Sequence, residues 1–412
     1  MKKIIRTILL LLSLIIYIYG FGLVSFPFGP RTIIDIAGLA WLMVDGKKYI
    51  DVFSKKYISL FVFAIVISMW GVVTMLANGS DEALFLSYPK NFFPWIGGSY
   101  FIFRLSRGVI EDFKSLSIFL AISVGLESII AVLIKFVPSV SMMISQYVLF
   151  KTGQYENAIE NILDYHRIIG LGDAVFFGVL PSCTIGSFSC IYLLKKETSR
   201  LAVVGYLLLF LVITIVSYFT ARTSGFVFVI SIFLYLIYHW KENNNTSVIK
   251  LLLSLGVLLF MLTSIIPKDF IPENMLEFAT SLDSNGSASQ IKEWYEEVSF
   301  TPSTFLIGDA HYERPDGSYY GGMDVGYFRL IFYGGIIGLL LVVFYYYFFF
   351  KKMINQTNES EIKLFFVAFF ISYLVMMLKG HIEFVDLLIL YLVFLDGLKC
   401  NYPNNKNRIL KA

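Results

Sequence analysis

Long apolar runs, separated by short charged or Pro-, Gly- and Asn-containing links, dominate the chain. A membrane-spanning helix needs about 20 predominantly apolar residues, and most of these runs approach or exceed that length. They lie near 1–24, 32–44, 57–77, 92–105, 115–137, 170–194, 201–219, 223–240, 249–266, 323–350, 363–378 and 383–398. The pattern predicts an all-α polytopic integral membrane protein with about 12 transmembrane helices. We expect a single membrane domain over residues 1–412.

Composition excludes an ordinary soluble protein. Hydrophobic residues make up 57% of the chain and charged residues 15%, with a mean hydropathy of +0.72, whereas soluble domains carry about 25% charged residues. The first apolar run is too long for a signal peptide and has no small-x-small cleavage site, so we interpret it as an uncleaved first span. The net charge of +3 is too small to indicate a nucleic-acid partner.

The distribution of Lys and Arg predicts the orientation. A cytoplasmic N-terminus places about two thirds of these residues in cytoplasmic loops, so we expect both termini in the cytoplasm. Two long loops, 138–169 and 267–322, then face the outer side of the membrane. The short cytoplasmic links leave no room for a nucleotide-binding domain, and the chain has no G-x-x-x-x-G-K-[ST] motif. Any driving force must come from the substrate or an ion gradient.

Half of the arginines, but only about a quarter of the lysines, fall on the predicted outer side. The guanidinium group suits bidentate contacts with phosphate, so this enrichment indicates an anionic ligand such as a lipid diphosphate. The candidates are Arg167, Arg222, Arg314 and Arg329. Arg222 lies in a tight outward turn between two strongly apolar spans, where a charge should have a partner. Arg31 is instead expected to extend from a helix end toward the membrane surface.

Each long loop also carries a His, an Arg and a carboxylate. His166 and Arg167 close the first loop, and Asp309 and His311 lie in the second. A carboxylate or a neutral imidazole could act as general base toward a sugar hydroxyl, although a lone loop histidine is as often a solvated residue. No Cys/His cluster, D-x-D or H-E-x-x-H motif is present, so we predict neither a metal nor another cofactor.

The start of the tenth span combines acidic, aromatic and basic residues. On a continuous helix, Asp324 and Tyr327 share a face, whereas Arg329 is turned away from Asp324 by roughly 140°. We therefore expect no local ion pair between Asp324 and Arg329. The glycines at 334, 335 and 338 that follow are typical of close helix packing.

Three further acids, Asp35, Glu127 and Asp386, fall inside apolar segments. Buried acids mark pathways or partners in membranes, and they are the main argument for a secondary transporter. Against it, most ionisable residues lie in outer loops and at span ends, rather than near the middle of the membrane as transport sites do.

The chain resembles the Wzy-type O-antigen and capsule polymerases, which are related to the O-antigen ligases. The likeness covers the whole arrangement of spans and the large late outer loop, together with short motifs. These motifs are Arg167-x-x-Gly170, Ala221-Arg222-Thr223-Ser224-Gly225, Gly308-Asp309 and Asp324-x-Gly326-Tyr327-x-Arg329-x-x-x-Tyr333-Gly334-Gly335. The resemblance implies a metal-independent membrane glycosyltransferase that joins undecaprenyl-diphosphate-linked repeat units into polysaccharide at the periplasmic face.

The resemblance also implies roles for individual residues. Arg167, Arg222 and Arg329 would bind the carrier diphosphate, and Asp324 or another loop acid would orient or deprotonate the acceptor hydroxyl. We thus take Asp324, Arg222, Arg329 and His311 as candidate catalytic residues, and Arg167, Arg314, Tyr327 and Asp309 as candidate substrate-binding residues.

The implied partners are the lipid-linked donor and acceptor, a chain-length-determinant membrane protein and the flippase of the same pathway. The ligase relatives place a His, often followed by Asn, in the large loop. Here His311 precedes Tyr312, which favours a polymerase over a ligase. The alternatives are an O-antigen ligase and a flippase or other transporter of lipid-linked oligosaccharide.

Overall fold

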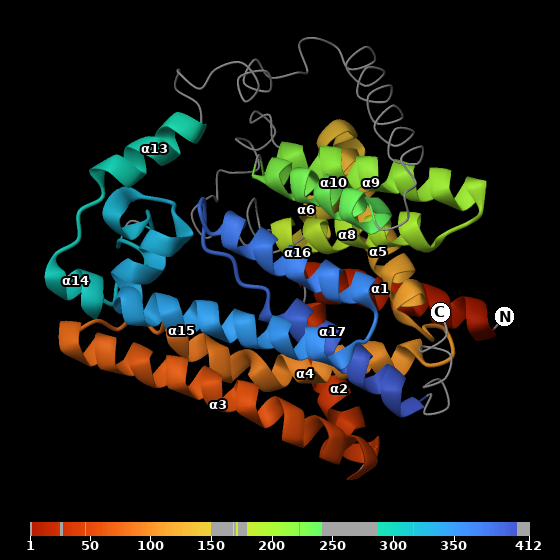
Figure 1. The fold of residues 1–412 in the computed structure, drawn as a ribbon, viewed down its shortest axis with the longest axis horizontal. Helices are drawn as coiled ribbons and strands as arrows, with labels where there is room; N and C mark the ends of the chain where they lie inside the picture. The colour runs from red at the N-terminus through yellow and green to blue at the C-terminus, as the bar shows by residue number, and fades with distance from the viewer. Residues whose placement is uncertain are drawn as a thin grey trace.

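The structure is a computed structural model, and it describes residues 2–24, 28–45, 47–149, 168, 170–171, 179–221, 223–240, 287–315 and 317–401. Almost all of this chain is helical (Figure 1). The α-helices are α1 (Lys2–Tyr19), α2 (Pro30–Asp45), α3 (Lys47–Asn78), α4 (Ser87–Ser106), α5 (Phe113–Phe136), α6 (Pro138–Tyr147), α8 (Leu180–Lys196), α9 (Arg200–Thr220), α10 (Ser224–Trp240), α13 (Ser287–Glu297), α14 (Pro302–Leu306), α15 (Gly326–Gln356), α16 (Ser360–Met376) and α17 (Val385–Asn401). Short 3-10 helices at Leu84–Leu86 and Tyr320–Gly322 and two strands complete the described elements.

The helices lie where hydropathy predicts them. Each expected apolar segment within the described ranges overlaps a helix, although several helix ends differ from the expected ones, and the segment expected at 249–266 lies outside those ranges. In the part of the chain that the structure describes, four helical stretches are long and apolar enough to cross a membrane: Tyr57–Asn78 within α3, α5, α9 and α15. The chain is therefore an all-α protein with apolar helices of membrane-spanning length.

Aromatic rings and close glycine contacts hold the helices together. Helix α2 packs on α4 because Gly38 meets Gly97: a Cβ on Gly38 would overlap the carbonyl of Gly97. Small residues of this kind let membrane helices approach closely. In α15, Gly334 and Gly338 face Phe85, and a Cβ on Gly334 would lie 2.8 Å from its ring. The expected packing role of these two glycines is confirmed.

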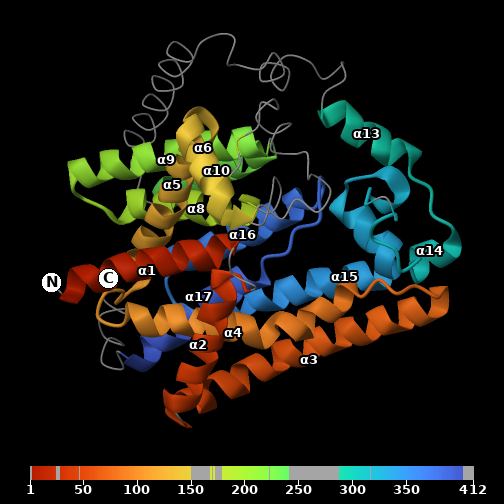
Figure 2. The same cartoon turned by 180° about the vertical axis from the view of Figure 1, so that it is seen from behind.

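Ion pairs join several helix ends at which the sequence predicted cytoplasmic charges. Arg104 Nε lies 2.9 Å from Asp45 Oδ2, and Lys114 Nζ lies 3.0 Å from Glu197 Oε2. Lys196 Nζ lies 3.4 Å from Glu359 Oε2. These pairs connect α2 with α4, α5 with α8 and α8 with α16. The start of α1 and the end of α17 lie at one end of the bundle, with α13 and α14 at the other (Figures 1 and 2).

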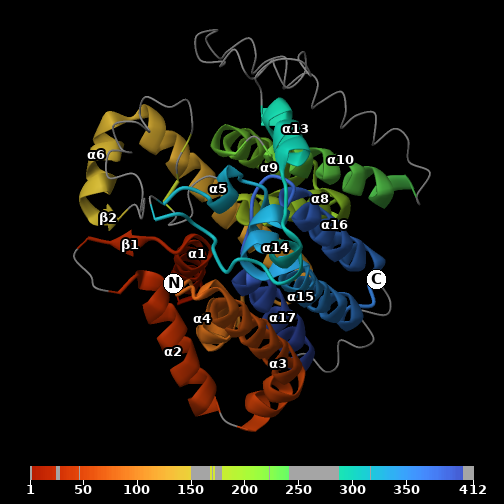
Figure 3. The same ribbon diagram turned by 90° about the vertical axis from the view of Figure 1, so that its left-hand side faces the viewer.

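The two long loops contain ordered structure in their described parts. Helix α6 begins the first loop, and strand β2 (Val148–Leu149) then pairs antiparallel with β1 (Gly22–Leu23). This strand pair lies on the flank of the bundle beside α6 (Figure 3). The second loop contains α13 and α14 before it reaches α15.

Glu127, one of the three buried acids, anchors the end of the first loop. Its side chain in α5 is 2% exposed, and its Oε1 atom accepts a hydrogen bond of 3.1 Å from the backbone N–H of Leu171. A Cβ on Gly170 would overlap the Glu127 carboxylate. The acid thus satisfies a part-buried backbone donor, which is a structural role.

We expect Gly170→Ala to destabilise the protein by about 1–3 kcal/mol, because the added methyl group displaces Glu127 from the Leu171 N–H and leaves buried polar groups unpaired. Thermal unfolding of the detergent-purified protein measures the effect. The control is Gly205→Ala, since a Cβ on Gly205 meets nothing within 4 Å. Equal unfolding temperatures for the two variants would contradict this account of Glu127.

Candidate functional site

The second long loop attaches to α15 at a break in that helix. Gly335 has φ +65° and ψ −173° within α15, so the regular helical hydrogen bonding is interrupted there. The backbone N–H of Asp309 donates to the carbonyl of Phe332 with an N···O distance of 2.6 Å. The N–H of Ala310 donates to the carbonyl of Tyr333 at 3.0 Å. The break in the helix therefore provides the acceptors that position the loop.

The end of α3 holds the same loop from the other side. Asn78 Nδ2 donates to the carbonyl of Gly308 at 3.0 Å, and Ser80 Oγ donates to the carbonyl of Ala310 at 2.7 Å. Side chains more than 200 residues away in the sequence thus bind the backbone of a loop that carries candidate site residues.

Glu82 holds the same loop one step further along, at His311 and Tyr312. Its Oε2 atom accepts a hydrogen bond of 2.6 Å from the backbone N–H of Tyr312, and its Oε1 atom lies 3.5 Å from Nδ1 of His311. The His311 ring also packs on Tyr320, with ring centroids 5.3 Å apart. His311 is thus held beside a carboxylate, and its side chain remains 41% exposed.

Arg329 is the centre of a group of side chains, here called the Arg329 cluster, that also contains Tyr312, Tyr319, Asp324 and Glu313. Its guanidinium carbon lies 3.7 Å from the ring centroid of Tyr312 and 4.1 Å from that of Tyr319. Its Nη1 atom lies 3.5 Å from Asp324 Oδ1 and its Nη2 atom 4.0 Å from Glu313 Oε1. The Arg329 side chain is only 8% exposed, and its Nε donor has no partner among the described residues.

The contact between Asp324 and Arg329 corrects the sequence expectation that they form no local ion pair. That expectation assumed one helix through both residues. Helix α15 instead begins at Gly326, and Val325 before it is extended, with φ −106° and ψ 118°. Asp324 therefore lies outside the helix, where its carboxylate can turn back toward Arg329.

Both carboxylate oxygens of Asp309 accept hydrogen bonds from residues of its own loop. Its Oδ1 atom accepts from Thr304 Oγ1 at 2.8 Å and its Oδ2 atom from the hydroxyl of Tyr320 at 3.3 Å. Burial and the neighbouring Asp309 charge raise the pKa of Tyr320, so this hydroxyl stays protonated and donates. The predicted substrate-binding role of Asp309 stays a prediction.

Tyr327 and Arg314 differ in their surroundings. The Tyr327 hydroxyl donates to the carbonyl of Leu374 at 2.7 Å and so binds α15 to α16. Arg314 is exposed in a turn in which its backbone N–H donates to the carbonyl of Ser318 at 2.7 Å. Arg314 is thus available to a ligand, whereas the Tyr327 hydroxyl already has a partner.

The link between α16 and α17 adds His381 and Glu383, which the sequence analysis did not select. Nδ1 of His381 and the hydroxyl of Tyr312 share a hydrogen bond of 2.9 Å. Burial, and then the charge of Arg329, lower the pKa of His381 to about 3, so its ring is neutral. Burial, and then the charge of Asp386, raise the pKa of Glu383 to about 7.

A sequence signal for these two residues existed. Lys379, His381 and Glu383 are three titratable residues in a link of a few residues between two apolar segments. The sequence analysis selected none of the three. The link of His381 to Arg329 runs through Tyr312, which no local pattern reveals.

Arg167 and Arg222 lie outside the described residues. Near them in the chain, the backbone N–H of Ile168 donates to the carbonyl of Phe219, at the end of α9, at 3.3 Å. The structure therefore joins the two stretches of chain next to these arginines, and their roles stay predictions.

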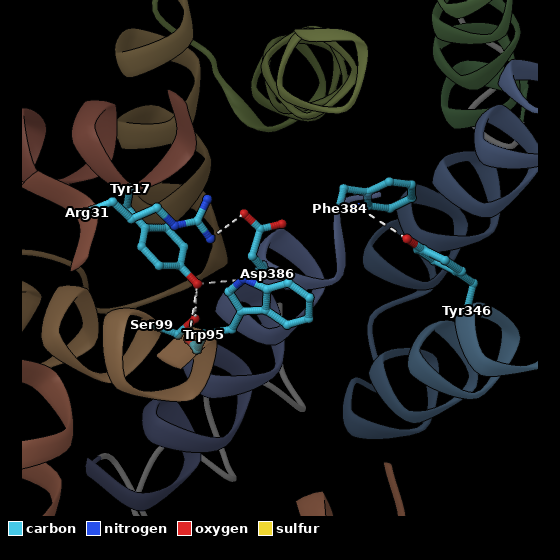
Figure 4. Close-up of polar contacts among 7 residues, drawn as sticks. All are labelled: Tyr17, Arg31, Trp95, Ser99, Tyr346, Phe384 and Asp386. Carbon is cyan, nitrogen blue, oxygen red and sulfur yellow. Dashed lines mark hydrogen bonds and ion pairs between the residues drawn. The ribbon is translucent and has the colours of Figure 1, made fainter. Parts of the chain in front are cut away.

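Arg31, which was expected to extend from a helix end toward the membrane surface, forms an ion pair with Asp386 (Figure 4). Its Nη2 atom lies 2.7 Å from Asp386 Oδ2, and its guanidinium carbon lies 4.8 Å from the ring centroid of Tyr17. The Tyr17 hydroxyl is hydrogen-bonded to Ser99 at 2.8 Å. This pair connects α2 with α17. Asp35 is buried nearby, and its Oδ1 atom has no hydrogen-bond partner in the described part of the chain.

Within the described ranges, no group of three or more His, Cys, Asp and Glu side chains is placed to hold a metal ion. Comparison of the chain with protein-family models, with curated proteins and with solved structures finds no match.

Proposed function

We propose that this protein is an O-antigen polymerase, a glycosyltransferase that joins undecaprenyl-diphosphate-linked repeat units into polysaccharide at the periplasmic face of the bacterial inner membrane. The observation that carries the proposal is the environment of Arg329. Its guanidinium is almost fully buried and held over two tyrosine rings, and its Nε donor is unused by the described residues. A buried guanidinium N–H that has no acceptor among the described residues favours an anionic ligand.

The surroundings of Arg329 fit a diphosphate ligand. Asp324 and Glu313 orient the guanidinium from one side, and the exposed Arg314 lies in the same loop. In glycosyl transfer from a lipid diphosphate, negative charge develops on the departing diphosphate. Fixed cationic donors stabilise that charge in the transition state. No nucleotide is required, because the diphosphate leaving group supplies the driving force.

The arrangement of the helix ends supports the proposed orientation. The Arg329 cluster lies at the start of α15, near α13 and α14, whereas the start of α1 and the end of α17 lie at the opposite end of the bundle (Figures 1 and 2). If the termini are cytoplasmic, as proposed, we expect the cluster on the periplasmic side. There it would meet the lipid-linked donor and acceptor, the chain-length-determinant protein and the flippase of the pathway.

Deletion of the gene tests the function directly. We expect the surface polysaccharide ladder of the deletion strain to collapse to the lipid core plus one repeat unit, and the restored gene to bring the ladder back. Gel electrophoresis of surface lipopolysaccharide measures both. An unchanged ladder would contradict an O-antigen polymerase. Loss of the ladder with full-length polymer still on the lipid carrier would identify a ligase instead.

A transporter of lipid-linked oligosaccharide is the second candidate. The buried Asp35, with an unpartnered oxygen close to the Arg31–Asp386 pair, is the observation that favours it, because unpaired acids inside a membrane mark pathways. Reconstituted vesicles distinguish the two functions. Movement of labelled lipid-linked oligosaccharide without any change in glycan length would support transport.

A further inference from the structure

The loop between α16 and α17 holds Glu383 in a fixed position. The hydroxyl of Tyr346 donates to the carbonyl of Ile382 at 3.4 Å and accepts from the N–H of Phe384 at 3.2 Å (Figure 4). The Tyr346 ring stacks on Tyr373, with centroids 4.2 Å apart. The backbone on both sides of Glu383 is therefore bound to one side chain of α15.

The same loop packs directly against the start of α15. A Cβ on Gly326 would lie 2.5 Å from the carbonyl oxygen of Gly380 and 2.8 Å from the backbone nitrogen of His381. The neutral His381 ring is hydrogen-bonded to Tyr312, and the Tyr312 ring lies beneath Arg329. The loop that carries Glu383 therefore packs against the start of α15, which carries Arg329.

Glu383 differs from the other acids of the site in its partners. Asp324 is ion-paired with Arg329, Asp309 accepts two hydrogen bonds, and Glu82 accepts from a backbone N–H. Glu383 has no Lys, Arg or His within ion-pair distance among the described residues. Its electrostatic neighbours are one acid, Asp386 of α17, and several tyrosine hydroxyls. These tyrosines are Tyr88 of α4, Tyr312 of the second long loop, Tyr345 and Tyr346 of α15, and Tyr373 of α16.

Glu383 is an exposed residue, so water and a sugar hydroxyl can approach its side chain. The protein around the carboxyl nevertheless desolvates it enough to raise its pKa to about 7. A base is most effective when its pKa is close to the working pH, because it is then both ionised and basic.

We propose that Glu383 is the general base of the glycosyl transfer, an inference that rests on the function proposed above. Its carboxylate takes the proton of the acceptor sugar hydroxyl while the hydroxyl oxygen forms a bond to the anomeric carbon of the donor. The bond from that carbon to the carrier diphosphate breaks, and its electron pair leaves with the diphosphate, whose charge Arg329 stabilises. Asp324 then acts by positioning Arg329 rather than as the base.

The test compares Glu383→Gln with wild type in lipid nanodiscs. Lipid-linked repeat units extracted from the deletion strain serve as donor and acceptor, and undecaprenyl diphosphate alone is the binding probe. We expect kcat to fall at least about 100-fold, with carrier affinity within about twofold of wild type. The control is Glu296→Gln on α13, where the exposed Glu296 lies 3.8 Å from Lys292, and it should retain full turnover.

Two further measurements separate proton transfer from a structural role. The wild-type kcat should rise about tenfold per pH unit below about pH 7 and then level off, since only the ionised carboxylate accepts the proton. Formate should partly restore turnover to Glu383→Ala by supplying a replacement carboxylate. If the variants do not fold, a wild-type pH profile without this rising limb still overturns the proposal.

The outcomes also separate this proposal from the proposed function. Wild-type protein that lengthens the glycan, together with a Glu383→Gln variant whose kcat is within threefold of wild type, would overturn the role of Glu383 alone. Equal loss of carrier binding and turnover would make Glu383 a binding residue and would equally overturn it. If the wild-type protein does not lengthen the glycan and the deletion strain keeps an unchanged ladder, the proposed polymerase function itself is overturned.

Discussion

Arg329→Ala is expected to abolish long polysaccharide chains, with a fall in kcat of about 100- to 1000-fold, the usual cost of removing one donor that stabilises transition-state charge. Arg329→Lys should also be strongly impaired. Lysine keeps the charge but has no planar fork, so it cannot lie over the rings of Tyr312 and Tyr319 and still present two donors to a diphosphate.

The measurement is polymer length on gels from cells that carry each variant, normalised to the amount of membrane protein. Removal of Arg329 breaks its ion pairs with Asp324 and Glu313, so thermal unfolding of the purified variants is measured in parallel. Arg200→Ala is the control, because Arg200 is an exposed arginine at the first turn of α9. Wild-type chain lengths in Arg329→Ala would remove this residue from the mechanism.

Hydropathy located the helices well because the apolar content of a segment depends on its own residues. The links were harder to predict because their conformation depends on partners that are distant in the sequence. The turn at Gly308, for example, is held by Asn78, and no local pattern in either segment reveals that contact. Helix positions were therefore predictable from the sequence, whereas the packing of the outer loops was not.

The environment of Arg329 shows where the periodicity argument failed. Asp324 was assigned to the helix because the apolar segment was read from residue 323. The structure begins the helix at Gly326, and this small difference decides whether Asp324 faces Arg329 or points away from it. Helix boundaries are the least certain part of any prediction from periodicity, so an argument about shared faces is weakest in the first turn.

The buried charges show the same dependence on distant partners. Arg31 and Asp386 are 355 residues apart in the chain and form a 2.7 Å ion pair between α2 and α17. Glu127 binds the backbone of Leu171. Asp386 and Glu127 are two of the three acids on which the sequence argument for transport rested, and both have structural partners. The transporter alternative therefore depends chiefly on Asp35, which weakens it relative to glycosyl transfer.

Gly335→Ala is expected to disrupt the site from a distance. Gly335 has φ +65° and ψ −173°, a conformation available essentially only to glycine. A Cβ there would also overlap the carbonyl of Leu306, at the end of α14. The substitution must therefore displace the loop that carries Asp309 or reform the helix. Either change removes the acceptors at Phe332 and Tyr333, so we expect destabilisation by at least about 3 kcal/mol and loss of polymer.

Gly79→Ala separates backbone strain from displacement of the loop. Gly79 also has a positive φ, +65°, but a Cβ there meets nothing within 4 Å. That variant should cost only about 1 kcal/mol and keep its polymerising activity. Thermal unfolding and polymer length are measured for both. If the two variants behave alike, the contact between the α15 break and the loop does not organise the site. A much larger effect at Gly335 would show that this contact determines where the Arg329 cluster forms.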